Sequence, residues 1–105
     1  MKRKIEAEVV FDKPILFINI CNQLGNCYLK TGDLKAAKEN FEQSLRLIRK
    51  VEGTSDKIDN AIIGKIYLNL AIIASHTNEH NNAFYLHQQS LEYKLKSIKG
   101  SMNND

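Results

Sequence analysis

Apolar residues recur at spacings of three and four in four segments of this chain, and polar turn residues separate the segments. This spacing predicts helices over about 13–30, 34–52, 58–76 and 81–99. Gly32 and Asn78 stand at two short turns, because both residue types accept the left-handed backbone that ends a helix. The order of elements predicts an all-α chain of two antiparallel helical hairpins.

Capping residues support these boundaries. Asp12 is expected to cap the first helix, with Pro14 in its first turn, and Asp33 is expected to cap the second. Gly53 is a natural stop for the second helix, and residues 53–57 supply turn and capping residues before the third. The third segment is apolar on most of its sides, so we expect that helix to be buried between neighbours.

A shift of 46 residues lays the second hairpin over the first. The shift pairs small or apolar residues with one another: Leu24 with Leu70, Gly25 with Ala71, Ala37 with Ala83, and Ser44-Leu45 with Ser90-Leu91. We expect Gly25 and Ala37 to face each other and to let the two backbones approach closely. Leu24, Tyr28 and Phe41 are then expected to fill and bury the space around that crossing.

The first hairpin reads Cys21-x2-Leu24-Gly25-x2-Tyr28 and then Ala37-x3-Phe41. This sequence resembles the tetratricopeptide repeat family over about Pro14–Ile98, although the leading Trp and trailing Pro of the pattern are missing. The repeat of 46 residues exceeds the common 34, so the resemblance is to a long-repeat variety. It implies an α-solenoid of stacked hairpins in one domain, with repeat one at about 14–52, repeat two at about 58–99 and a polar, mobile tail at 100–105.

The two ends of the chain carry further expectations. Arg3-Lys4-Ile5-Glu6 is similar to Arg49-Lys50-Val51-Glu52 at the same shift, so residues 2–10 are either a partial N-terminal helix or a lead-in. Val10 and Phe11 are expected to pack on the first hairpin. At the other end, the sequence stops where a third repeat would begin, and the apolar row of the fourth helix includes Phe84. We expect that helix to contact a second copy, a partner subunit or a continuation of the chain, through an end-face interface at Leu91, Tyr93, Leu95 and Ile98.

Length and composition narrow the class of protein. The chain has 105 residues and a formal net charge of +3, with basic residues spread along it, which is weak support for a nucleic-acid partner. No apolar run approaches the ~20 residues of a membrane span, and the start lacks a signal-peptide pattern. We therefore expect an intracellular, cytoplasmic location and no membrane partner. Cys21 and Cys27 are too far apart on one helix to form a disulfide, and both are expected to be small buried hydrophobes.

Candidate catalytic and metal-binding residues are few. His76 and His80 have the spacing of two zinc ligands on one helix, but the turn at Asn78 breaks that helix and no cysteine lies nearby, so no metal is expected. His80 and His87 take the places of Leu34 and Phe41 and are expected in or beside the core. The sequence shows no phosphate-binding loop, no nucleophile–base arrangement and no paired carboxylates. These observations argue against an enzyme and against a cofactor.

The family resemblance implies that the first arm of each hairpin lines a concave groove for a peptide or a partner helix. In such a groove, asparagine side chains bond to the peptide backbone as donor and acceptor. Asn26 and Asn69 match the two most telling family positions and are expected to lie off the apolar rows, whereas Asn22 stands where a carboxylate clamp would need lysine. The resemblance thus implies a protein–protein interaction module, a scaffold or adaptor; the alternative is a peptide-sensing domain of a signalling regulator. The matching groove positions are Asn19, Asn22, Asn26, Leu29 and Lys30 in the first helix, and Lys65, Leu68, Asn69, Ile72 and His76 in the third.

Overall fold

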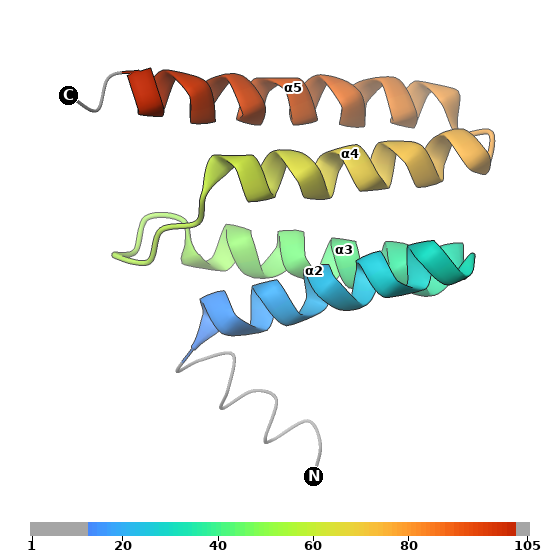
Figure 1. Ribbon diagram of the computed structural model, residues 1–105, viewed down its shortest axis with the longest axis horizontal. Coiled ribbons are helices and arrows are strands. Elements are labelled where there is room, and N and C mark those ends of the chain that lie inside the picture. The colour runs from blue at the N-terminus through green and yellow to red at the C-terminus, as the bar shows by residue number, and fades with distance from the viewer. Residues whose placement is uncertain (1–12, 103–105) are drawn as a thin grey trace, which may run out of the picture. The chain divides into compact units, whose positions relative to one another are not determined.

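The computed structural model describes residues 13–102, with side chains through residue 100. Within these residues the chain forms helices and no strands (Figure 1). The prediction of an all-α chain is confirmed. The helices are α2 (Pro14–Thr31), α3 (Leu34–Val51), α4 (Asn60–His76) and α5 (His80–Met102).

Two predicted boundaries differ from the structure by two residues or more. The helix predicted to begin at residue 58 begins at Asn60, because the Asp59 carboxylate accepts a hydrogen bond from the Ala61 N–H at 2.9 Å and so caps it. The predicted tail begins too early, since α5 continues through Gly100 to Met102. Residues 103–105, the partial N-terminal helix, the cap at Asp12 and the packing of Val10 and Phe11 all lie outside the described residues.

The turns inside the two hairpins have the predicted chemistry. Gly32 ends α2 with a φ of 86°, and the Asp33 carboxylate accepts a hydrogen bond from the Ala36 N–H at 3.1 Å. Asn78 has a φ of 62° between α4 and α5. Both turns therefore place a residue that tolerates left-handed backbone where the chain reverses.

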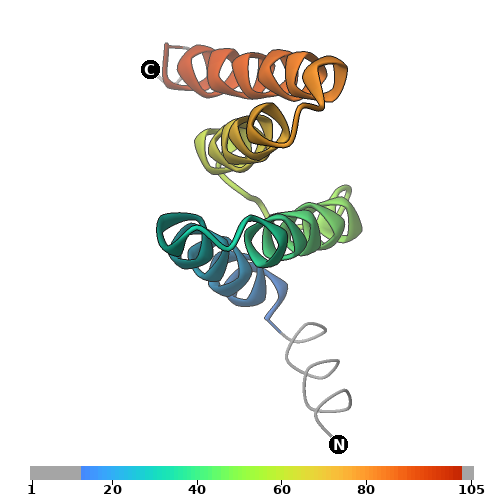
Figure 2. The ribbon, with the colours of Figure 1, turned by 90° about the vertical axis from the view of Figure 1, so that its right-hand side faces the viewer.

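The described chain divides into two compact units, one ending at Lys57 and one beginning at Ile58. Each unit contains one hairpin, whose two arms lie side by side and antiparallel (Figures 1 and 2). Phe41 and Ile18 are fully buried in the first unit. A Cβ added at Gly25 would lie 2.7 Å from the Phe41 ring, and its three nearest atoms all belong to that ring. The side chain nearest to Gly25 is therefore that of Phe41, and Ala37, which was predicted to face Gly25, is fully buried on the same helix.

In the second hairpin, α4 is buried on most of its sides, as predicted. The Tyr67 and Tyr93 rings stack between α4 and α5, with centroids 5.6 Å apart and planes 12° apart. Lys96 Nζ lies 4.6 Å from the centroid of the Tyr93 ring. The aromatic stack therefore joins the two arms of this unit, and the cation–π contact lies within α5 beside it.

Both hairpins contain the same buried hydrogen bond. Ser44 Oγ donates to the Ile18 carbonyl at 3.0 Å, and Ser90 Oγ donates to the Gly64 carbonyl at 2.7 Å. Both donors and both acceptors are related by the 46-residue shift. The sequence repeat is therefore also a repeat of internal contacts.

Candidate functional site

One side of α2 carries three amide side chains followed by a leucine, and we call this row the asparagine face: Asn19, Asn22, Asn26 and Leu29. Their spacing of three and four residues places them on one side of the helix. All four are half-buried, and Lys30 beside them is exposed. The predicted first-arm residues therefore do share a face.

Asn22 has the most unusual polar group on this face. Its side-chain oxygen is buried and accepts no hydrogen bond from any described residue. A buried acceptor without a donor costs about 1–3 kcal/mol. Because this oxygen is buried, an incoming N–H donor would reach it only after the half-buried Asn22 side chain turns outward, and the new hydrogen bond would then be stabilising.

The predicted residues of α4 do not all share one face. Lys65 is exposed, Leu68 and Ile72 are half-buried, and His76 is exposed, all at helical spacing on one side. Asn69 is instead buried, at 8% exposure. The position after Leu68 lies about 100° further around the helix, on the buried side. The prediction that Asn69 lies off the apolar rows is therefore wrong, and its replacement should cost more than a surface substitution.

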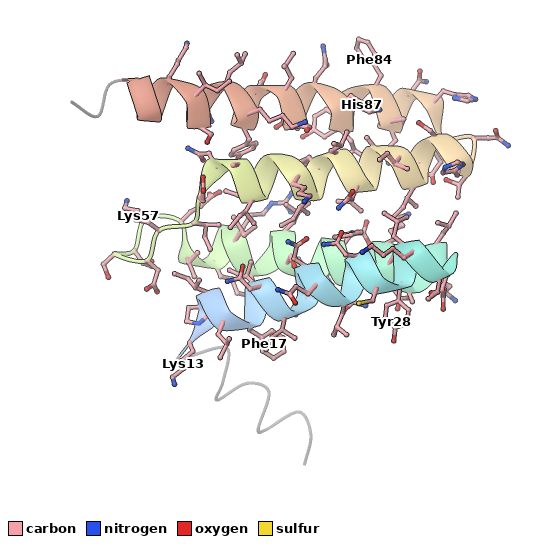
Figure 3. All side chains as sticks on the ribbon, in the orientation of Figure 1. Lys13, Phe17, Tyr28, Lys57, Phe84 and His87 are labelled. Carbon is pink, nitrogen blue, oxygen red and sulfur yellow. The ribbon has the colours of Figure 1, made fainter. Side chains whose placement is uncertain are left out.

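A second row on α2 is apolar and exposed. We call it the α2 stripe: Leu16, Ile20, Leu24 and Tyr28, spaced by four residues and each more than a third exposed. Figure 3 shows Phe17 and Tyr28 projecting from the same side of α2. The prediction that Leu24 and Tyr28 are buried around the helix crossing is wrong, because both are exposed and the side chain nearest to Gly25 is that of Phe41.

Cys27 lies three residues after Leu24 and is exposed, whereas Cys21 is buried. The predicted burial is confirmed for Cys21 and wrong for Cys27. Position 21 belongs to the row that contains Ile18 and Gly25, which faces α3, and position 27 belongs to the outer side.

The end-face residues of α5 separate into two groups. Leu91, Leu95 and Ile98 are exposed and share one side with Phe84, which points away from α4 in Figure 3. We call these four residues the α5 stripe. Tyr93 lies on another side, because its ring stacks on Tyr67. It therefore packs within the hairpin.

His76, His80 and His87 are all exposed, so the predicted core positions of His80 and His87 are wrong. Ala71, the repeat equivalent of Gly25, is fully buried, so the second hairpin lacks the glycine against which the Phe41 ring packs in the first. Among the described residues, no group of three or more His, Cys, Asp or Glu side chains could hold a metal ion.

The comparisons with known proteins fit this repeated geometry. The family model for the tetratricopeptide repeat matches residues 17–96, which span both hairpins. Neither the comparison with curated proteins nor the comparison with solved structures gave a match. In the described part of the chain, no helix is long and apolar enough to cross a membrane. Repeats of the matched family generally mediate protein–protein interaction and are typically not enzymatic. With a match over most of its length and two hairpins that repeat the same internal contacts, the chain belongs to the tetratricopeptide repeat family.

Proposed function

We propose that the asparagine face of α2 binds an extended segment of another protein, and that the chain serves as a scaffold or adaptor module. The observation that carries this proposal is the buried Asn22 side-chain oxygen, which no described residue satisfies. When the half-buried Asn22 side chain turns outward, the backbone N–H of an extended peptide supplies the missing donor.

The chemistry of the face fits a peptide backbone better than a single side chain. Each carboxamide offers one acceptor and two donors, which match the N–H and C=O groups that alternate along an extended strand. Leu29 adds an apolar contact at the end of the row. The described residues 14–29 include no charged side chain, so binding there depends on hydrogen bonds and apolar contact more than on charge.

On α4, a second row is formed by Lys65, Leu68 and Ile72. It differs from the asparagine face because it carries apolar side chains where α2 carries amides. We assign it apolar side-chain contacts and assign backbone recognition to α2. His76 ends this row and is exposed.

The test uses a display library of random peptides selected on the immobilised full chain, followed by calorimetric titration of a selected peptide. Asn22→Ala and Asn26→Ala should each weaken binding several-fold, the effect of losing a hydrogen bond worth about 0.5–1.5 kcal/mol. Asn82→Ala is the matched control, because Asn82 is an exposed asparagine on α5.

The same variants separate binding from stability. Asn22→Ala should leave the free energy of unfolding unchanged or raise it, since the substitution removes a buried acceptor that lacks a donor. Selected peptides that bind both α2 variants as tightly as the parent chain would place recognition elsewhere and refute the proposal.

A further inference from the structure

The α2 stripe and the α5 stripe are two exposed apolar rows on different helices. Four large apolar side chains form each row, with exposures of 38–49% on α2 and 47–66% on α5. Exposed apolar rows of this kind mark interaction surfaces. We propose that the α5 stripe of one copy of this chain docks on the α2 stripe of a second copy, so that the copies associate head to tail.

The internal repeat supports this choice of partner. The 46-residue shift carries Ile20, Leu24 and Tyr28 of the α2 stripe onto Ile66, Leu70 and Ala74 of α4, which are all buried at 5% exposure or less. It likewise carries Leu91 of the α5 stripe onto Leu45, which is buried. Three of the four positions of the α2 stripe therefore correspond to buried positions of the second repeat, and in the α5 stripe Leu91 does so.

Stacked repeats cover these positions with a neighbouring repeat, because one hairpin cannot bury its apolar face alone. A second copy of the chain supplies a neighbour with the required surface on each side. The α2 helix of one copy then meets the α5 helix of the next.

The dimensions of the stripes match. At a rise of about 1.5 Å per residue, the α2 stripe extends about 18 Å from Leu16 to Tyr28, and the α5 stripe extends about 21 Å from Phe84 to Ile98. One stripe can therefore cover the other along nearly its full length.

Charge favours pairing between unlike helices. Lys94, Lys96 and Lys99 accompany Glu92 along the second half of α5, so pairing of two α5 stripes would bring two sets of lysines together. No charged side chain lies between Lys13 and Lys30 on α2. The α2 stripe therefore accepts α5 without like-charge repulsion.

The test combines two variants of the full chain. Leu24→Asp places a charge in the α2 stripe, and Leu95→Asp places one in the α5 stripe. In sedimentation velocity, the parent chain should form species that grow with concentration, since a head-to-tail contact closes into rings or extends into open chains. Each variant alone should remain monomeric.

An equimolar mixture of the two variants should form a species of twice the monomer mass and nothing larger. The intact α5 stripe of Leu24→Asp can pair with the intact α2 stripe of Leu95→Asp, and no other intact pair exists. Tyr85→Asp is the matched control, because Tyr85 is an exposed aromatic residue of α5 outside the stripe, and this variant should associate like the parent chain.

Circular dichroism should show unchanged helix content in each variant; Ile20→Asp and Ile98→Asp replace any variant that loses helix. A parent chain that stays monomeric at all concentrations would overturn the proposal. If the Leu24→Asp variant still associates, either the α5 stripes pair with each other or something other than a second copy covers the α2 stripe. Either result would contradict docking of α5 on α2. A mixture that remains monomeric would also overturn the head-to-tail arrangement.

Discussion

At the scale of single residues, the two hairpins differ at the position that Gly25 occupies in the first. Gly25 lies against the Phe41 ring, whereas the equivalent Ala71 is buried and His87, the equivalent of Phe41, is exposed. The sequence predicted that position 25 must be small. It did not predict which side chain makes the contact, because spacing places Ala37 and Phe41 on the same side of α3.

Gly25→Ala should lower the free energy of unfolding by about 1–3 kcal/mol. The new Cβ would lie 2.7 Å from a fully buried ring that has little room to move, and this cost exceeds the gain of about 1 kcal/mol in helix propensity. Urea unfolding followed by circular dichroism measures the difference.

Gly100→Ala is the control for that measurement. Gly100 lies in α5 with no atom within 4 Å of an added Cβ, so the same substitution there should be neutral or slightly stabilising. Equal effects at positions 25 and 100 would mean that Gly25 is not at a packed contact.

At the scale of helices and turns, the apolar spacing and the caps predicted the four helices to within three residues at each end. The exposure of the apolar residues on the outer side of α2 was not predicted. That helix carries two apolar rows, one through Ile18 and Cys21 and one through Ile20 and Leu24, and helical spacing cannot tell which row a neighbour covers. The row of amides on α2 stands apart from both apolar rows, so its members share one side of the helix, and its role in binding stays a prediction.

The turn between α4 and α5 gives a prediction at this scale. Asn78→Ala should lower the free energy of unfolding by about 1–2 kcal/mol, because alanine is strained at a φ of 62°. Asn78→Gly should have little effect, since glycine adopts this conformation freely. Thermal unfolding of both variants beside Asn82→Ala, a helical control, measures the difference. Similar midpoints for the alanine and glycine variants at position 78 would contradict left-handed backbone in this turn.

At the scale of the whole molecule, the 46-residue shift predicted two similar hairpins, and the buried bonds from Ser44 and Ser90 confirm the repeat. The sequence also predicted an uncovered apolar surface on the last helix. It did not predict that α2 also exposes an apolar row, because residues of the same kinds are buried at the equivalent positions of α4. Whether an apolar row is buried depends on which helices pack against it, and the sequence of one repeat does not identify those helices.

Head-to-tail association predicts that stability depends on protein concentration. The thermal midpoint of the parent chain should rise with concentration, since association stabilises the folded state by mass action. The midpoint of Leu95→Asp should not change over the same range. Differential scanning calorimetry on both proteins makes the comparison, and a parent midpoint independent of concentration would contradict association of the folded chain.

Because one cysteine is exposed and the other is buried, thiol labelling can report on association of the chain without any substitution. Cys27 is exposed beside Leu24 and Tyr28, whereas Cys21 is buried. A thiol reagent should therefore label one sulfur in the folded protein and both after denaturation. When α5 of another copy covers this side of α2, the labelling of Cys27 should slow, and the rate at each concentration then measures the fraction of α2 helices that remain open.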